Sequence, residues 1–589
     1  MKNQILIKKQ KEVTMTNNII LSLQNNFTKM SHLNKFHYLV LLTIIVSVSY
    51  CQTNVDNTFQ ATSEFQPVIK ESVKFSELPE IVDTVKRIKN LKYGIVSNPL
   101  FPKYSVQTIE SAKMKNEPLQ KLYHSYLKVG YAPLYTTPYG EFFITNTRSR
   151  KMAYGAKLKH FSSTGKLDST GTADFSDNEG SIFAKKFYHK HTLYGDLSYK
   201  RNVVHYYGYN TLKNQIDEKN KDFTRQRYQL IEPKIKLQSH FKDSSDINHV
   251  IDFAYYNLQN LHREAENNIK LHTDVSTFLN HEKLNVGLYA DYYNHKQSTD
   301  TINDLIVSLA PSFEASGKKW HATVGLQGTL DNFRSKTKFY FYPKLDFEYD
   351  IYEHLIVPFV GVNGGLTKNS MRSLSDANPF LDTTFQYTNS NTKYKVYGGL
   401  KGNLSTNTSY YLEGSYSKVD SMMFFVLDYS GLNQMYNRFD AIYDNTTMIN
   451  VKGSVQYQLR EKIKFMATGN YYLYQTENLE RAYHRPDYDL TLSFLYNLKS
   501  KFIIRTDIYT IGKQWSYTPV FNATLNKTEM QSQQLKGLID ANIELEYRYS
   551  SMLSFFTRFS NIANQRYYRW ERYPSQRFNF MIGLTFVPF

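Results

Sequence analysis

Residues 339–350 read FYFYPKLDFEYD, and an apolar side chain stands at nearly every odd-numbered position. Successive side chains of an extended strand point to opposite faces, so this spacing sets an apolar face against a more polar one. The same period of two recurs in residues 488–498 and 539–549. These runs are about ten residues or longer, whereas strands of soluble proteins average about five or six. The pattern therefore predicts strands that are long enough to cross a membrane.

The two faces of these strands can be assigned residue by residue. The apolar face of the three runs carries Phe339, Phe341, Pro343, Leu345, Phe347 and Tyr349, then Tyr488, Leu490, Leu492, Phe494, Tyr496 and Leu498, then Ile539, Ala541, Ile543, Leu545, Tyr547 and Tyr549. The other face carries most of the charged and amide side chains, among them Lys344, Asp346, Glu348, Asp489, Asn497, Asp540, Glu544 and Arg548. Strands that cross a membrane as a barrel alternate in this way, with apolar residues towards lipid and polar residues towards the lumen.

The connections between the predicted strands are of two lengths. Short polar turns are centred near Ser149, Lys190, Ser244, Glu282, Lys318, Tyr352, Thr406, Glu461, Ser500 and Ser550. Longer polar loops span residues 162–178, 208–224, 368–384, 428–446 and 511–532. Short periplasmic turns and long extracellular loops are typical of outer-membrane barrels, and a soluble sandwich or propeller does not require them. Ten short turns, with both chain ends in the periplasm, predict an all-β, transmembrane, antiparallel barrel of about 22 strands over residues 121–589.

Composition supports the same class of protein. The chain has 49 Tyr and 38 Phe but only 3 Trp, and aromatic rings that are polar at one end favour the two membrane interfaces. The formal charge is +18, but the basic residues are spread singly along the strands and form no basic helix or cluster. This spread argues against nucleic acid as a partner and favours anionic lipid headgroups and lipopolysaccharide at the barrel rim.

The amino-terminal segment, residues 1–51, has the layout of an export signal. Its apolar run, Tyr38 to Tyr50, is too short for a membrane-spanning helix, which needs about 20 residues. Basic residues precede this run and small residues lie near its end, as in a signal peptide that is cleaved after Cys51. A lipoprotein signal is the alternative, although Tyr50 stands where a small residue is expected. Cys51 is the single cysteine of the chain, so cleavage would leave no thiol for a disulfide or a metal site.

The chain ends with NIANQRYYRWERYPSQRFNFMIGLTFVPF, residues 561–589. Its alternating apolar residues and final aromatic residue resemble the closing strand that the barrel-assembly machinery recognises, and they predict an assembly signal formed by Phe580, Ile582, Leu584, Phe586 and Phe589. The whole segment resembles the terminal hairpin of TonB-dependent receptors, and residues 112–131 and 136–143 resemble a group of receptor-like barrels from Bacteroidota. The resemblance implies a barrel in the cell outer membrane with a receptor or transport role.

The resemblance is incomplete near the amino terminus. Receptors of this family close a wide lumen with a plug domain of well over a hundred residues, whereas residues 52–120 number only about 70. This extension is too short for a full plug, so the lumen would be filled by loops, closed by a partner protein or left open. The sequence EIVDTV, residues Glu80, Ile81, Val82, Asp83, Thr84 and Val85, could pair as a strand with a periplasmic energy-coupling protein.

Motifs of catalysis are missing from the sequence. It contains no G-x-S-x-G, no G-x-x-x-x-G-K-[ST] and no H-E-x-x-H, and we expect neither an enzyme nor a bound cofactor or resident metal. Asp174, Asp177 and Glu179 could contact a calcium ion, but a solvated loop is the simpler interpretation. Two functions stay open: a receptor-like barrel for nutrient or solute uptake, and a plugless structural or assembly barrel that belongs to an envelope complex.

Overall fold

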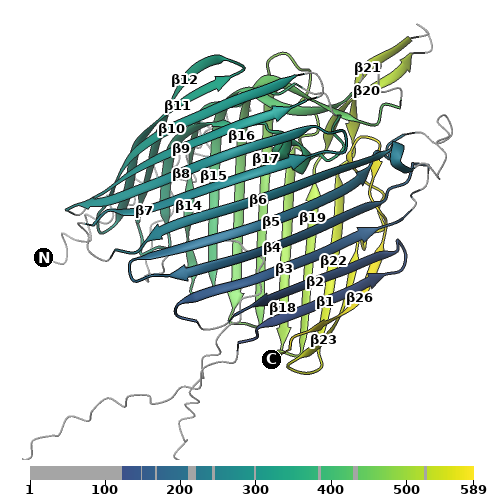
Figure 1. Ribbon diagram of the computed structural model, residues 1–589, viewed down its shortest axis with the longest axis horizontal. Helices are drawn as coiled ribbons and strands as arrows, with labels where there is room; N and C mark the ends of the chain where they lie inside the picture. The colour runs from purple at the N-terminus through teal and green to yellow at the C-terminus, as the bar shows by residue number, and fades with distance from the viewer. Residues whose placement is uncertain are drawn as a thin grey trace, which may run out of the picture.

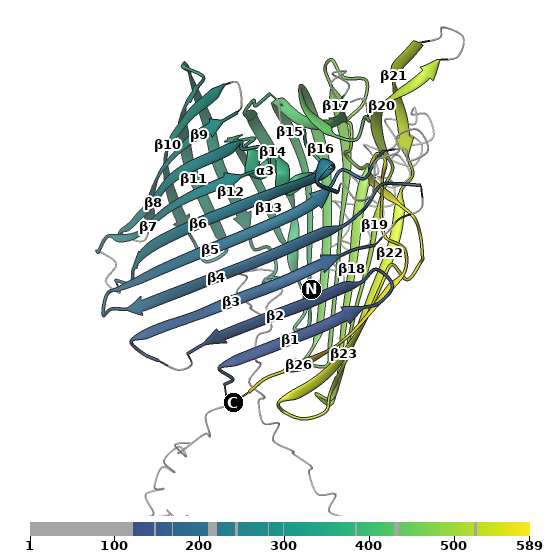
Figure 2. The same cartoon turned by 45° about the vertical axis from the view of Figure 1, so that its right-hand side comes forward.

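The structure, a computed structural model, describes residues 122–588 except 147–148, 166, 168, 210–220, 242–245, 281, 298–299, 383–385, 429–434 and 523–526. Residues 1–51 and 52–120, together with Phe589, lie outside the described residues. The described chain forms one closed antiparallel barrel of 22 strands, as predicted (Figures 1 and 2). No helix in the part of the chain that the structure describes is long and apolar enough to cross a membrane.

The barrel strands follow one another around the ring in chain order. They are β1 (Ser125–Ala132), β2 (Thr137–Thr145), β3 (Met152–Ser163), β4 (Phe175–Phe187), β5 (His191–His205), β6 (Arg225–Ser239), β7 (Asn248–Gln259), β8 (Ala265–Leu279), β9 (Glu282–Lys296), β10 (Thr301–Ser316), β11 (Trp320–Phe333), β12 (Lys336–Tyr349), β13 (Val357–Thr367), β14 (Ser390–Ser405), β15 (Thr408–Leu427), β16 (Phe439–Leu459), β17 (Ile463–Thr476), β18 (Tyr488–Leu498), β19 (Phe502–Ile511), β22 (Leu538–Arg548), β23 (Leu553–Ser560) and β26 (Asn579–Phe586).

The remaining elements lie in the loops at one end of the barrel. These are the 3-10 helix η1 (Lys221–Phe223), the helix α3 (Met371–Ala377), the hairpin β20 (Gln514–Asn522) and β21 (Lys527–Leu535), and the short pair β24 (Tyr568–Trp570) and β25 (Tyr573–Pro574). All ten predicted short turns lie between consecutive strands at the opposite end, where the described chain begins (Figure 1). The loop-bearing end is therefore the extracellular end.

The predicted faces are confirmed. Phe339, Phe341 and Tyr549 are 67%, 69% and 65% exposed and cover the outside, whereas Tyr342 and Asp540 point inward and are 2% exposed. The side chains that face the lumen pair with one another across neighbouring strands. Lipid outside and water inside therefore explain the alternation that the sequence shows.

The ring closes where the last strand meets the first. β26 pairs with β23 on one side and with β1 on the other, and Gly583 lies opposite Gly130 in the β1 ladder. Phe580, Ile582, Leu584 and Phe586 all lie on β26, as predicted. Their role as an assembly signal remains a prediction.

Two of the predicted loops contain strand segments that pair beyond the barrel rim. Residues 439–446, assigned to a loop from their polar residues, belong to β16, because this strand extends beyond the barrel rim together with β15. The predicted loop 511–532 contains β20 and much of β21, which form a separate two-stranded sheet. In both places the strands pair with each other above the rim of the barrel. They do not contact lipid there, so their sequences lack the long apolar face from which strands were predicted.

Candidate functional site: the extracellular cap

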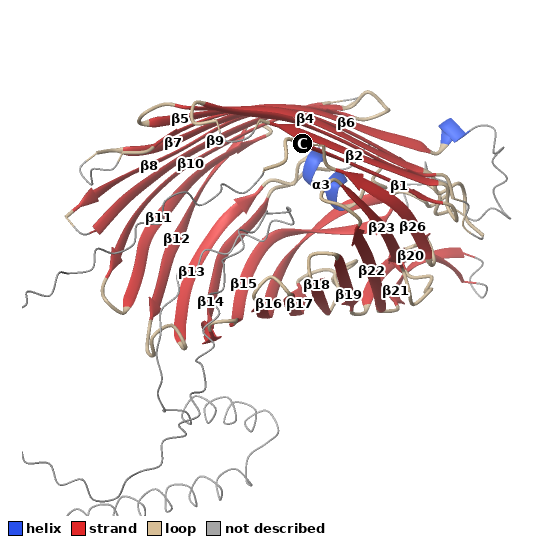
Figure 3. Ribbon diagram, turned by 90° about the horizontal axis from the view of Figure 1, so that it is seen from below, coloured by secondary structure: helices blue, strands red, loops and turns tan. Residues whose placement is uncertain are grey.

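Two loops meet over the extracellular mouth of the barrel. One is loop 368–389, which contains α3, and the other is loop 561–578; we call the described residues of these two loops the cap. Seen along the barrel from below, α3 lies inside the ring of strands (Figure 3). The cap therefore occupies the lumen mouth rather than standing above it.

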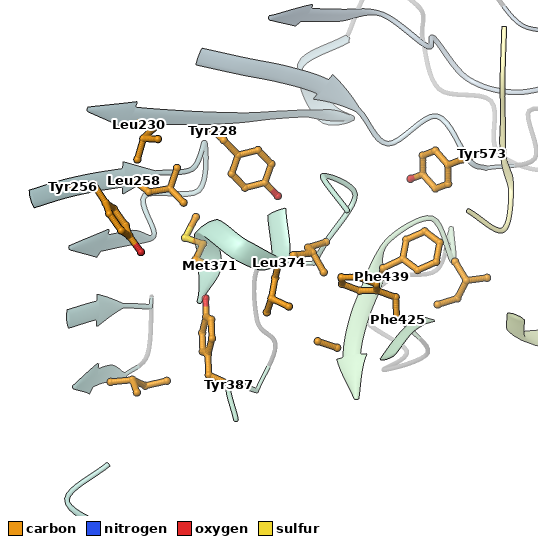
Figure 4. Packing of buried hydrophobic residues seen from close by; sticks show 14 residues of the cluster. Tyr228, Leu230, Tyr256, Leu258, Met371, Leu374, Tyr387, Phe425, Phe439 and Tyr573 are labelled. Carbon is orange, nitrogen blue, oxygen red and sulfur yellow. The ribbon is translucent and has the colours of Figure 1, made fainter. Parts of the chain in front are cut away.

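The cap has an apolar core that draws on distant parts of the chain (Figure 4). Its buried members are Tyr228, Leu230, Tyr256, Leu258, Ile302, Met371, Leu374, Leu381, Tyr387, Phe425, Leu427, Phe439, Ala441 and Tyr573. These residues belong to β6, β7, β10, β15 and β16 as well as to the cap loops. β6 and β16 lie on opposite sides of the ring. The nine strands β7 to β15 separate them in one direction around the ring, and eleven strands separate them in the other direction. The cap core therefore spans the mouth.

Polar anchors fix α3 to the inner wall. Glu266, which is 1% exposed, accepts hydrogen bonds from the backbone N–H groups of Met371 (2.7 Å) and Arg372 (3.2 Å). The Arg372 guanidinium binds Glu232 through both terminal nitrogens, at 2.9 and 3.1 Å. A bidentate pair of this kind fixes orientation as well as distance. A local capping box between Ser370 and Ser373 begins the helix.

Both ends of loop 368–389 bind the same carboxylate. Lys368 Nζ lies 2.5 Å from Asp304 Oδ2, and Asn389 Nδ2 donates to that oxygen at 3.0 Å. Asn389 Nδ2 also lies 3.0 Å from Asp331 Oδ1 on the next strand. The loop thus leaves and rejoins the barrel at one buried polar site.

The second cap loop packs onto the first through aromatic rings. The rings of Phe380 and Tyr573 are stacked with centroids 3.8 Å apart, and the Tyr207 ring meets that of Tyr573 edge-on at 4.8 Å. Such ring pairs add to the free energy gained from burying apolar area. The two cap loops therefore form one packed unit.

The extension of β15 and β16 beyond the barrel, residues 422–427 and 439–444, forms what we call the rim hairpin. It begins at a bulge after Val419, where Ser421 adopts a left-handed conformation with φ 54°. One face of the rim hairpin contributes Phe425 and Phe439 to the cap core. The other face contributes Phe424, Val426 and Ile442 to a second cluster, where loop 477–487 and β20 supply Tyr483, Leu479, Ala482, Trp515 and Tyr517.

A small cavity lies beside the cap. Its volume is about 210 Å³, and it is lined by Leu167, Ala173, Asp174, Phe175, Val204, His205, Tyr207, Phe380 and Gln576. Binding sites for drug-sized ligands usually measure about 300–1,000 Å³. The cavity therefore accommodates part of a ligand of that size, and a larger ligand would have to displace cap residues.

The lumen wall below the cap carries a network of charges. Glu544 lies 3.4 Å from Lys128, 2.8 Å from Arg505 and 2.5 Å from Arg558. Glu546 lies 3.1 Å from both Arg505 and Arg548. Four cations thus surround two carboxylates, which leaves this stretch of the wall with an excess of positive charge.

The turn between β7 and β8 supplies a titratable group beside the cap. Burial, together with the nearby Asp382 carboxylate, raises the pKa of Glu264 from its usual value near 4.5 to about 7. The folded turn therefore favours the protonated form of Glu264. Below about pH 4.5 the side chain is protonated in both the folded and the unfolded turn and does not change the stability of the turn. As the pH rises through 7, its ionisation destabilises the folded turn by up to about 3 kcal/mol. Amide exchange of residues 260–264, corrected for its intrinsic pH dependence, should therefore accelerate between pH 5 and 8.

The Glu264→Gln variant provides the control for this prediction. It keeps the size of the side chain and the polar contact with Asn260, whose Nδ2 lies 2.7 Å from Glu264 Oε2, but it cannot ionise. Exchange in the variant should not accelerate over the same pH range. Equal acceleration in both proteins would show that another group controls the turn.

The structure separates the other candidate residues of the sequence. Residues 80–85 and Phe589 lie outside the described residues. Asp174 lines the cavity, whereas Asp177 and Glu179 lie on β4, where the Asn202 amide donates to Asp177 at 2.5 Å. No group of three or more His, Cys, Asp or Glu residues suited to a metal ion occurs in the described ranges, so the calcium site is not supported.

The sequence did not reveal the cap. Loop 368–384 was expected to be a polar extracellular loop, loop 477–487 was not among the predicted loops, and residues 561–578 were assigned only to a terminal hairpin. The available signal was the concentration of large apolar residues between two strands, as in Met371, Leu374, Phe380 and Leu381.

No protein-family model matches the sequence, and no curated protein is detectably similar to it. Solved structures are similar in fold at low identity. The siderophore receptor PirA of Acinetobacter baumannii matches with a TM-score of 0.59 and 9% identity, over 80% of this chain and 81% of that one. The FrpB iron transporter of Neisseria meningitidis matches with a TM-score of 0.61 and 8% identity, over 80% and 82%. The ferric enterobactin receptor PfeA of Pseudomonas aeruginosa, a G324V mutant, gives 0.57 and 12% over 78% and 79%.

The chain has the fold of these receptor barrels. The fold implied by the resemblance to TonB-dependent receptors is thereby confirmed. Closed antiparallel barrels of this kind, with an apolar outer face and long loops at one end, belong to the outer membrane.

Proposed function

We propose that the protein is an outer-membrane receptor-type barrel that takes up a nutrient or solute from outside the cell. The observation that carries this proposal is the cap, which covers the extracellular mouth and is held to the inner wall by its apolar core and by a few ion pairs and hydrogen bonds. A cover built from loops can be displaced by a bound ligand, whereas the barrel wall cannot. The polar lumen below the cap then provides a hydrated path.

Iron chelates are the first substrate class to test. The three similar structures are named for siderophore or iron uptake, and the excess of positive charge around Glu544 and Glu546 suits an anionic chelate. We expect cells that lack the protein to lose uptake of radioactive iron supplied as a panel of ferric siderophores, ferric enterobactin included. A plasmid copy should restore uptake of at least one of them. Unchanged uptake of the whole panel would contradict this substrate class.

The partners of this function are part of the proposal. The barrel-assembly machinery would insert the chain by reading Phe580, Ile582, Leu584, Phe586 and Phe589 in the terminal strand. A periplasmic energy-coupling protein would pair with residues 80–85. Deleting those six residues should then abolish uptake but leave binding of the ligand at the cell surface intact.

A structural or assembly role is the second candidate. It is favoured by the length of residues 52–120, which is too small for a separate plug domain of the kind described for TonB-dependent receptors. A barrel of this type would hold a lumen-filling partner. Purification from native membranes in mild detergent distinguishes the two roles, because a stoichiometric partner supports assembly and a barrel without one supports uptake.

A further inference from the structure

Two carboxyl groups lie side by side where loop 368–389 leaves and rejoins the barrel. They belong to Asp304 of β10 and Asp331 of β11, which are 1% and 4% exposed, and we call them the carboxyl pair. The two groups lie within hydrogen-bonding reach of each other. Two carboxyl groups at this distance cannot both ionise without strong repulsion, so such a pair readily holds one proton between its members.

Little positive charge is available to offset the pair. Lys368 comes from the cap, and its Nζ lies 2.5 Å from Asp304 Oδ2. Lys338 stands opposite Asp331 in the β11–β12 ladder, and Lys336 is two residues away, but both are exposed and neither forms an ion pair within the described residues. One lysine for two buried aspartates leaves one negative charge, which a proton would neutralise.

The other titratable groups around the pair do not supply the missing charge. Glu266 adds a third carboxylate, and His295, which lies 3.8 Å from it, can at most balance that one. The remaining titratable side chains nearby are Tyr293, Tyr340 and Tyr342, which are uncharged at neutral pH, and Asp420, which already pairs with Lys393 at 2.9 Å.

The cap is fastened to the carboxyl pair at both ends of loop 368–389. Lys368 stands at the start of this loop, and Asn389 stands at its end and donates through its amide to both aspartates at 3.0 Å. Asp304 Oδ1 is buried and has no hydrogen-bond donor among the residues that the structure describes. A proton on Asp331 would supply a donor, because a protonated carboxyl group has an O–H where the ionised group can only accept.

We propose that the carboxyl pair is a proton latch that holds the cap closed. In the closed cap the pair keeps one proton, Asp331 donates to Asp304, and Lys368 and Asn389 hold the two ends of the loop. When the proton passes to water, two negative charges face each other in a buried site. The loop then leaves the wall, and water solvates the pair.

The pH dependence follows from the number of protons that each state binds. In the open cap, water solvates both aspartates, which then ionise at about pH 4. Below that pH the closed and open states are protonated alike, and the pair does not bias the cap. As the pH rises further, the open state is favoured more and more, until the closed cap has also lost its proton. The cap therefore stays closed in acidic surroundings and opens more often at neutral and alkaline pH.

The latch regulates the same cap on which the proposed uptake function rests. Its test measures how often the cap exposes a buried side chain and needs no transported solute. Failure of the latch would therefore leave the uptake proposal standing. A protein without uptake activity could still show the latch.

Chemical labelling of a buried cap position measures the opening. Ser375 lies on α3 and is 8% exposed, so Ser375→Cys introduces a thiol that a water-soluble methanethiosulfonate reagent reaches when the cap opens. Dividing the rate by that of a small free thiol at the same pH removes the pH dependence of the thiolate itself. All variants carry Glu264→Gln, because Glu264 titrates beside the cap over the same pH range. The protein without Ser375→Cys reports any labelling of Cys51.

We expect the corrected labelling rate to rise at least about tenfold between pH 5 and pH 8. Asp331→Asn keeps a donor for Asp304 but cannot ionise, so its labelling should be slow at both pH values. Asp274→Asn is the matched control, because Asp274 also faces the lumen but binds Tyr289, at 2.6 Å, rather than the cap. This control should keep the full rise.

Lys368→Gln provides a test that does not depend on the Asp331→Asn variant. Without the lysine charge the pair keeps its proton to higher pH, so the midpoint of the rise should move upward by about one pH unit. Loss of an anchor alone would raise the rate and leave the midpoint in place, which would contradict the latch. A labelling rate that is independent of pH, or a rise that persists in Asp331→Asn, would overturn it. Fast labelling of Asp331→Asn at both pH values would also overturn it, because the charge of Asp331 would then be what anchors the loop.

Discussion

Excising residues 370–387 and joining Asn369 to Thr388 through two glycines should convert the barrel into a stable open pore. The excised chain contains α3 and much of the cap core, including Met371, Leu374 and Leu381. The cut ends already lie together, because Asn369 Nδ2 donates to the backbone oxygen of Thr388 at 2.7 Å. We therefore expect the hairpin of β13 and β14 to keep its structure. Single-channel conductance in a planar bilayer measures the change.

A second excision controls for the loss of loop mass. Removing residues 518–531 and joining Tyr517 to Ser532 shortens the hairpin of β20 and β21, which projects away from the mouth (Figure 1). Trp515 and Tyr517 stay in place, so the cluster on the rim hairpin is retained. We expect this variant to conduct as little as the unchanged protein. If the first excision also leaves conductance low, the lumen is blocked below the cap.

Replacing Gly583 with valine should prevent the barrel from closing. A Cβ at this position would lie 2.2 Å from the backbone oxygen of Val129 and 2.3 Å from the Phe556 ring. A backbone oxygen cannot move aside without breaking the ladder between β26 and β1. Overpacking usually costs about 1–3 kcal/mol, and here the strain falls on the single pairing that joins the two ends of the barrel. We expect the variant to lose the heat-modifiable, folded band on gels and to fall to low levels in the outer membrane.

Gly140→Val is the matched control for this prediction. Gly140 lies opposite Val129 in the neighbouring β1–β2 ladder, and no heavy atom lies within 4 Å of an added Cβ. The control should fold and insert normally. Equal loss of both variants would indicate a general intolerance of branched residues in these strands, and normal folding of both would show that the closing ladder adapts to the extra volume.

The strands were predictable because lipid and water act on each strand separately. The expected run 488–498 coincides with β18, and the expected run 339–350 overlaps β12 apart from its ends. The membrane requires an apolar residue at every second position, so the pattern is contained within a dozen neighbouring residues. The ten short turns follow from the same pattern, because polarity rises on both faces where a strand leaves the membrane.

The cap could not be predicted in the same way. Tyr228, Leu374, Phe439 and Tyr573 are far apart in the sequence and become neighbours only when the ring has closed. Tyr228 and Phe439 belong to strands, and Leu374 and Tyr573 belong to the cap loops, so no single local pattern contains all four. Long-range packing, rather than local periodicity, brings these residues together.

The position of the cap core has a mechanical consequence for the barrel as a whole. Because this core joins walls on opposite sides of the ring, it acts as a crossbeam that resists flattening of the extracellular cross-section. At the periplasmic end, the described strands are held by their ladders and by pairs between nearby strands, such as Lys128 with Glu544. Lateral pressure from a thinner or more curved bilayer would therefore deform the periplasmic end first, and the outline of the extracellular mouth would stay constant.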